Sequence, residues 1–380
     1  MNDDKRRGLL KATVLAGIGL AAPVFACHFT PISAGNCGDA CAPAPNPDPK
    51  QDAAAQELEK PVVCAIDPAL LNDGATGEAI LSVSPDGSHI YVSRPRKSIT
   101  YRLNVGPGCN LTLDTTFAEG GLLRNSVGSV YETASGIFID TGADLIPLGG
   151  EKACTIGPFL LAITDEGDVG FMVSRLETDP KTVRKLTPAG CTVHESDPSA
   201  PTLRPAPHIA AGMGPNGTIV FANKPKDEAT MLESFDPATN KVTSFVALSE
   251  SASVKDFVPT ALRDCDGDVC ALGFNKGGHA FYRFDGSGKV VREMTPSLGS
   301  TLPTEVRNAM VLKEATGAIA RGGIAFVPYL SGGKLGIVRL SLNYAPAPAA
   351  DASTDAPISD AQHDGGTTDA ANDATDAGSD

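Results

Sequence analysis

The chain has 380 residues, a formal net charge of -14, 40 glycines, 29 prolines and no tryptophan. This acidity, with no basic stretches interleaved with aromatic residues, argues against nucleic-acid binding. Apolar residues come in short runs and long amphipathic periods are missing, which excludes a helical bundle and indicates an all-β class.

The first 26 residues have the features of an export signal. Lys5, Arg6 and Arg7 precede the apolar stretch Ala12–Ala26, which is shorter than the about 20 residues that a membrane-spanning helix needs. The stretch Arg6–Lys11 resembles a twin-arginine signal with Leu in place of Phe. A basic start for the general export route is the alternative.

The end of this segment, Val24-Phe25-Ala26-Cys27, resembles a bacterial lipobox. The resemblance implies that Cys27 is acylated and becomes the mature N-terminus, so that the chain is anchored to the cell envelope, at the outer membrane. Phe25 is larger than the residue usual in this pattern. Ordinary cleavage after Ala26, with secretion of the chain, is therefore the alternative.

The number of cysteines is consistent with acylation of Cys27. Nine cysteines are an odd number, and removing Cys27 leaves eight, an even set that indicates disulfides in an exported protein. Cys265 and Cys270 flank a hairpin turn and are predicted to pair, and Cys37 and Cys41 are predicted to close a small loop. Three pairings are open to the remaining four, one of them Cys64 with Cys109 and Cys154 with Cys191.

A glycine turn between two short apolar runs recurs from Pro61 to Tyr344, as in Ala79–Val83 and Ile90–Val92. The last four turn glycines are spaced 50 residues apart, and Gly136 supplies a unit missing from the 80-residue gap before them. The six glycines are Gly87, Gly136, Gly167, Gly217, Gly267 and Gly317. Hairpins at a fixed period predict a repeat architecture.

Each turn is followed by a third strand, a polar turn and a fourth strand. Matching examples are Leu103–Leu111, Leu186–Val193, Phe235–Val242 and Phe284–Val290. Four strands per unit, repeated six times, predict a six-bladed β-propeller. The last unit ends at its third strand, Leu335–Leu342, whereas Val62–Ile66 has the pattern of a fourth strand without a blade of its own. We therefore expect this N-terminal strand to complete the last blade and close the ring.

Family resemblances agree with this architecture. Leu113–Gly121 resembles the delta-sixty repeat of bacterial β-propellers, over one unit only. Gly214–Phe221 and Phe235–Thr239 are similar to blades of lactonase-type and virginiamycin B lyase-like propellers. Paired glycines are similar to kelch blades but lack the tryptophan of that pattern. These motifs mark blade geometry, and none carries a catalytic residue in this sequence.

The chain beyond the repeats is predicted not to fold. Residues 346–380 contain eight aspartates and no Lys or Arg, a composition typical of disordered, solvated tails. The expected organisation is a signal peptide over 1–26, a Pro/Ala-rich tether over 27–60, the propeller over 61–345, and the tail over 346–380.

Searches for catalytic motifs find none. There is no G-x-S-x-G, H-E-x-x-H or phosphate-binding loop. The densest polar cluster, His194–Asp197, is expected to be a solvated loop. Asp264, Asp266 and Asp268 are similar to a calcium loop for two positions only, and are expected to form a hairpin turn. We therefore predict no catalytic residue and no metal ligand, and the sequence specifies no cofactor.

Cations follow the turn glycines of four blades at a similar interval. The predicted ligand-binding residues are Arg94, Arg96, Arg175, Lys224 and Lys276, with Lys97, Lys226 and His279 close by. They fall in the loops joining second and third strands, on the face where propeller channels usually open. Their gathering on one face of an acidic protein predicts a site for an anionic glycan or protein partner. The alternative is that they are solvated loop residues.

The sequence thus favours a lipid-anchored cell-envelope protein whose propeller is a binding or scaffolding module. The alternative is an extracytoplasmic propeller enzyme of lactonase or lyase type. The first is preferred because no acid–base pair and no metal-ligand set is visible in the sequence.

Overall fold

The computed structural model describes residues 57–67, 79–124, 128–150, 153–157, 159–175, 183–194, 208–224, 229–248, 254, 256–276, 278–295, 302–309, 315–331 and 334–345. All of them belong to one compact unit, Ala55–Asp380. The predicted signal peptide and tail lie outside the described residues, as do Cys27, Cys37, Cys41 and Lys226.

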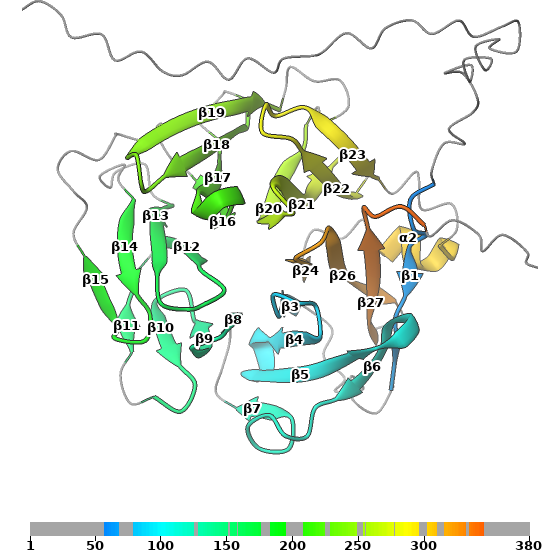
Figure 1. Cartoon of the computed structure of the whole chain (residues 1–380). Helices are drawn as coiled ribbons and strands as arrows, with labels where there is room; N and C mark the ends of the chain where they lie inside the picture. Colours follow the sequence, from blue (N-terminus) through cyan, green and yellow to red (C-terminus); the bar gives the residue numbers. More distant parts are fainter. Residues whose placement is uncertain are drawn as a thin grey trace, which may run out of the picture. The chain divides into compact units, whose positions relative to one another are not determined.

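Six four-stranded antiparallel blades are arranged in a ring, which confirms the six-bladed β-propeller (Figure 1). Blade 1 comprises β3 (Ala79–Val83), β4 (His89–Arg94), β5 (Ile99–Gly106) and β6 (Asn110–Leu113), and blade 2 comprises β8 (Ser129–Thr133), β9 (Gly136–Asp140), β10 (Asp144–Pro147) and β11 (Cys154–Thr155). Blade 3 comprises β12 (Phe159–Ile163), β13 (Gly170–Ser174), β14 (Arg184–Thr187) and β15 (Thr192–His194), and blade 4 comprises β16 (His208–Met213), β17 (Ile219–Asn223), β18 (Met231–Asp236) and β19 (Lys241–Ala247). Blade 5 comprises β20 (Val258–Cys265), β21 (Asp268–Asn275), β22 (Gly278–Phe284) and β23 (Val290–Met294), and blade 6 comprises β25 (Ala318–Ala320), β26 (Ile324–Ser331), β27 (Lys334–Ser341) and β1 (Val62–Val63).

The remaining elements are short. They are β2 (Ala65–Ile66), β7 (Leu122–Arg124), β24 (Ala315–Thr316), the helix α2 (Thr304–Ala309) and three single 3-10 turns, η1 (Pro95–Lys97), η2 (Pro107–Cys109) and η3 (Pro215–Gly217). Within the described part of the chain, no helix is both long and apolar enough to span a lipid bilayer.

The hairpin turns follow the chemistry predicted for them. In blade 5, Asp266 and Gly267 both have positive φ, +52° and +90°, and join Cys265 directly to Asp268. A two-residue turn with positive φ at both positions matches the twist of the flanking strands and favours Asp-Gly. Asp266 therefore lies in a structural hairpin turn, while Asp264 and Asp268 lie in the flanking strands β20 and β21.

The sixth turn differs from the prediction. Gly317 lies between β24 and β25, and the hairpin that joins β25 to β26 is Arg321-Gly322-Gly323. Gly322 and Gly323 have φ of +73° and +72°. A Cβ at Gly317 would stand 2.6 Å from Leu272 Cδ2 and 2.7 Å from the Phe326 carbonyl oxygen. Glycine is needed here for close packing of blade 6, and the regular 50-residue period ends one unit earlier than predicted.

The hydrophobic core is divided among the contacts between neighbouring blades. Six apolar clusters fill the six junctions of the ring. The second strand of a blade is covered on both faces, so that all five residues of β17 are buried. Burial of this kind makes each blade depend on both of its neighbours.

The N-terminal strand closes the ring, as predicted. Val62 pairs with Arg339 and Val63 with Val338, and the Cys64 amide donates to the Ile337 carbonyl at 2.9 Å. This pairing begins before the expected start of the domain at Pro61, because Leu58 forms a bridge with Tyr344.

Blade 1 is contacted both by the N-terminal segment and by the strand that precedes blade 6. β2 runs parallel to β6, β24 runs parallel to β3, and a disulfide joins Cys64 to Cys109. The junction of blades 6 and 1 is therefore held by strand pairing on both sides and by a covalent bond.

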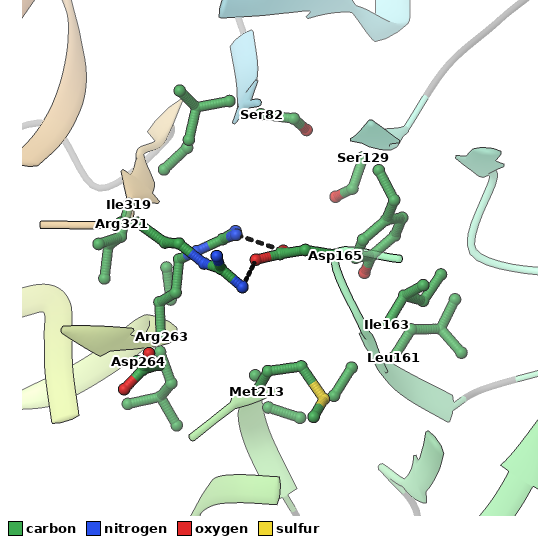
Figure 2. A pocket seen from close by; sticks show the side chains of 18 of the residues that line it. Ser82, Ser129, Leu161, Ile163, Asp165, Met213, Arg263, Asp264, Ile319 and Arg321 are labelled. Atoms are coloured by element: carbon green, nitrogen blue, oxygen red, sulfur yellow. Dashed lines mark hydrogen bonds and ion pairs between the residues drawn. The ribbon is translucent and has the colours of Figure 1, made fainter. Parts of the chain in front are cut away.

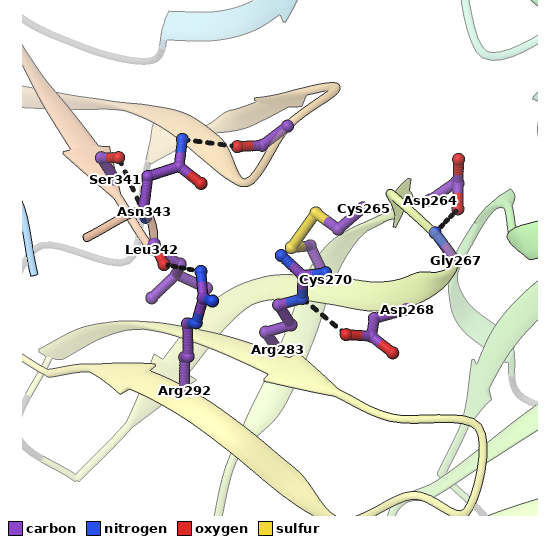
Figure 3. Close-up of a disulfide and its surroundings, with 11 residues drawn as sticks. Asp264, Cys265, Gly267, Asp268, Cys270, Arg283, Arg292, Ser341, Leu342 and Asn343 are labelled. Atoms are coloured by element: carbon purple, nitrogen blue, oxygen red, sulfur yellow. Dashed lines mark hydrogen bonds and ion pairs between the residues drawn. A yellow bond between two sulfur atoms is a disulfide. The ribbon is translucent and has the colours of Figure 1, made fainter. Parts of the chain in front are cut away.

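The structure contains three disulfides among its described residues, Cys64–Cys109, Cys154–Cys191 and Cys265–Cys270. The predicted hairpin disulfide is confirmed, and of the three open pairings the structure has the one named above. Cys265 and Cys270 lie in the core between blades 5 and 6, beside the ion pair of Arg283 with Asp268 (Figure 3). Disulfides of this number indicate an oxidising, extracytoplasmic location.

Candidate functional site

A pocket of about 470 Å³ occupies one end of the central channel. Every blade contributes residues from its first strand, from the segment just before it or from the turn that follows it. The contributing segments are 81–83, 129–133, 161–166, 211–217 without Pro215, 260–264 and 316–321 without Ala320. This volume is in the range of small-molecule sites, about 300–1,000 Å³.

Three charged side chains meet near the middle of this pocket (Figure 2). Asp165, from the first turn of blade 3, receives Arg263 Nη2 on Oδ1 at 2.5 Å and Arg321 Nη2 on Oδ2. Arg263 belongs to β20 of blade 5, and Arg321 to the first turn of blade 6. One carboxylate thus joins three blades across the channel.

Packing between turns explains why Asp165 faces the channel. The backbone amides of Ala134 and Ser135, in the first turn of blade 2, donate to the carbonyls of Asp165 and Glu166 at 2.8 and 2.9 Å. A Cβ at Gly167 would stand 2.1 Å from Thr133 Oγ1. Glycine lets the two turns approach closely, and this contact fixes the backbone that carries Asp165.

Arg321 is held in a similar way at the junction of blades 6 and 1. Its amide donates to the Pro85 carbonyl at 2.9 Å, and Ala320 packs against Gly87. Its side chain is 57% exposed, whereas those of Arg263 and Asp165 are 20% and 19% exposed. Burial lowers the pKa of Arg263, and the charge of Asp165 opposes that shift. The deeper guanidinium therefore depends on a carboxylate for its compensation.

The rest of the wall is partly apolar. Leu161, Ile163, Met213 and Ile319 surround the charged group (Figure 2). The pocket therefore combines an apolar surface with a few fixed polar groups, as ligand sites commonly do.

Glu132 lines the pocket, but its carboxylate interacts with Tyr91 and His89 at the junction of blades 1 and 2. It accepts a hydrogen bond from the Tyr91 hydroxyl at 2.8 Å, and its carboxylate lies 3.1 Å from His89 Nδ1. Burial raises the pKa of Tyr91, and Glu132 adds to that shift. Tyr91 is fully buried, so this group braces two blades.

The predicted cations lie at the opposite ends of the blades. None of the five lines the pocket, because each ends or follows a second strand, whose end lies beside the start of the first strand. Arg94 is 2% exposed, whereas Arg96, Arg175 and Lys224 are exposed. Lys276 is exposed and pairs with Asp256 at 2.8 Å. They share a face, but as separate groups on four blades.

The remaining candidates, His194 and His279, do not line the pocket. His194 ends β15, is exposed and lies 3.3 Å from Thr187 Oγ1, while residues 195–197 are outside the described residues. His279 is 2% exposed and packs on Phe274. Among the described residues, no three His, Cys, Asp or Glu side chains gather in a way that would hold a metal ion.

Comparisons with known proteins bear on the architecture alone. No family model matches the chain, and no curated protein matches it. Among solved structures it is similar to a putative TolB from Agrobacterium tumefaciens, with 12% identity, 70% of this chain and 90% of that chain covered, and a TM-score of 0.38. It is also similar to a putative gluconolactonase, with 12% identity, 77% of this chain and 95% of that chain covered, and a TM-score of 0.40. A third similar structure is the β-propeller domain of Myceliophteria thermophila Cps50 (Swd1), with 9% identity, 69% of this chain and 82% of that chain covered, and a TM-score of 0.42. These neighbours differ in function, and similarity at this level says nothing about a ligand.

Proposed function

We propose that the protein is a cell-envelope lipoprotein whose propeller is a binding module with its ligand site in the channel pocket. The observation that carries the proposal is the pocket itself, which all six blades build and into which Arg263, Arg321 and Asp165 project. Fixed polar groups beside an apolar wall give orientation and affinity to a small ligand.

A ligand screen tests this site. Thermal melting of the full mature chain is followed with acidic sugars, small carboxylic acids and lactones, and the hits are repeated on two variants. Met213→Trp fills the pocket, and Val291→Trp places the same ring on the exposed outer strand β23. We expect a ligand that stabilises the wild type and Val291→Trp equally but not Met213→Trp. Equal stabilisation of both variants would place the ligand elsewhere.

The alternative function, a lactonase- or lyase-type enzyme, is tested by the same panel. Product formation is followed for the lactones and glycans during the screen. We expect no turnover by the wild type. Turnover lost in Met213→Trp and kept in Val291→Trp would replace the binding module by an enzyme.

Lipid anchoring is the second part of the proposal. The lipobox-like junction and the odd cysteine support acylation of Cys27, and the three disulfides support export. Radiolabelled palmitate should enter the wild type and not Cys27→Ser. Equal labelling of the two proteins would contradict the anchor and leave plain secretion.

A further inference from the structure

We propose that Arg263 and Arg321 form a carboxylate-binding subsite of the channel pocket, which Asp165 occupies in this structure and from which a ligand carboxylate displaces it. The inference rests on the proposed function, because the ligand has to enter the same pocket.

The geometry is that of a receptor for one carboxylate. Each oxygen of Asp165 is taken by a different guanidinium, Oδ1 by Arg263 and Oδ2 by Arg321. The two arginines come from blades 5 and 6, and the carboxylate comes from blade 3 on the far side of the channel (Figure 2). The two cations therefore come from different blades than the carboxylate that they bind. Guanidinium groups arranged in this way recognise planar carboxylates.

Replacing the Asp165 carboxylate by a ligand carboxylate leaves the number of ion pairs to the two arginines unchanged. The incoming group forms the two ion pairs that Asp165 gives up, and Asp165, on a turn at the pocket wall, gains water. Access is provided by Arg321, which is 57% exposed. The charge of Arg321 further lowers the pKa of the largely buried Arg263. The two guanidinium groups therefore favour a bound anion at all times. The ligand's contacts with the rest of the pocket decide whether that anion is Asp165 or the ligand carboxylate.

The surrounding wall narrows the ligand class. Glu132, Glu166 and Asp264 also line the pocket, and additional negative charges on a ligand would face them. Leu161, Ile163, Met213 and Ile319 offer apolar contact to the remainder. The subsite therefore fits a small molecule with a single carboxylate and an apolar body, with hexanoate as a simple probe.

Removal of the internal carboxylate tests the subsite. Asp165→Ala leaves two unpaired cations, so its melting temperature should fall and should recover as hexanoate is added. Hexanoate should bind Asp165→Ala on the order of tenfold more tightly than the wild type, because the competing group is gone. Asp168→Ala is the matched control, since its carboxylate lies on the same turn and bonds to Thr164. It should bind hexanoate like the wild type.

Other anions distinguish the chemistry. Phosphate, sulfate and citrate are compared with hexanoate on Asp165→Ala. Equal recovery with all four would mean an unselective cation cluster, and no recovery with hexanoate would mean that Asp165 only braces the blades. Either result would overturn the proposal.

A second variant serves if Asp165→Ala does not fold. Arg321→Gln changes an exposed side chain, and calorimetry should find hexanoate binding on the order of tenfold weaker than in the wild type. Unchanged binding would overturn the subsite. If hexanoate binds the wild type and rescues Asp165→Ala, but no other screened ligand binds in the wild-type pocket, the subsite stands and the proposed function fails. If a pocket ligand binds the wild type, Asp165→Ala and Arg321→Gln alike, the function stands and the subsite fails.

Discussion

At the scale of single residues, two buried histidines make stability depend on pH. His279 is 2% exposed, and among the described residues neither of its ring nitrogens has a hydrogen-bond partner. Burial lowers its pKa to about 4. Burial also lowers the pKa of His208, although its Nδ1 donates to the Ser174 carbonyl at 2.7 Å. Both rings are therefore neutral at pH 7, and protonating them opposes folding.

The expected pH effect of His279 follows from its lowered pKa. The unfolded ring titrates near pH 6.5 and the folded ring near 4, so the unfolded state binds more protons between these values. Stability should fall as the pH is lowered through this window, by about 3 kcal/mol for this residue. In urea unfolding at pH 7 and 4.5, His279→Phe should lose less stability than the wild type and than the exposed control His194→Gln. Identical losses in the three proteins would contradict this.

At the scale of elements, the hairpins were predictable because their turns need particular residues. Asp266-Gly267 has positive φ at both positions, and few residues other than Asp, Asn and Gly accept that backbone. Gly317 was misassigned because glycine there permits close packing. Sequence alone does not separate these two reasons for a glycine, so the predicted turn of blade 6 lies before the strand β25, whereas the hairpin turn follows that strand.

The candidate site was predicted less well than the fold. The exposed cations were found because they follow the repeat. Asp165 lies within a repeated turn, and Arg263, 98 residues further along the chain, directly precedes the corresponding turn of blade 5. Only the closed ring brings the two together, and the period of a repeat does not say which side chains face the channel.

The exposed cations at the far face remain a prediction for a second, acidic partner. Arg96→Glu combined with Lys224→Glu should weaken binding to polygalacturonate and flatten its salt dependence, because fewer ion pairs form. Lys289→Glu, on an exposed turn between β22 and β23, is the matched control. Binding by the double variant that matches the control in strength and salt dependence would show that these cations are only solvated.

The disulfides are expected to differ in their contributions to stability. Cys64–Cys109 closes a separation of 45 residues and Cys265–Cys270 one of 5, while all four cysteines are buried. Loop-closure entropy then gives about 4 kcal/mol for the first and about 2 kcal/mol for the second. Urea unfolding of the two double Cys→Ala variants measures the difference. A larger loss for the hairpin disulfide would contradict the entropic account.

At the scale of the whole molecule, closure of the ring and the channel site are linked. Blades 6 and 1 are joined through β1 with β27, β2 with β6 and β24 with β3. Across the same junction the Arg321 amide bonds to the Pro85 carbonyl. The N-terminal segment therefore completes a blade, and it also stabilises the junction that positions one of the pocket's arginines.

Deletion of residues 57–66 tests this closure most directly. The variant lacks both pairing strands and the Cys64–Cys109 disulfide, so the Cys64→Ala/Cys109→Ala variant is its control, with the strands kept and only the bond removed. Urea unfolding should show a loss well beyond the control's about 4 kcal/mol, with aggregation as the exposed edges of blades 6 and 1 pair between molecules. A deletion variant that unfolds in one transition at the same urea concentration as the control would show that the ring is not closed by its N-terminal strand.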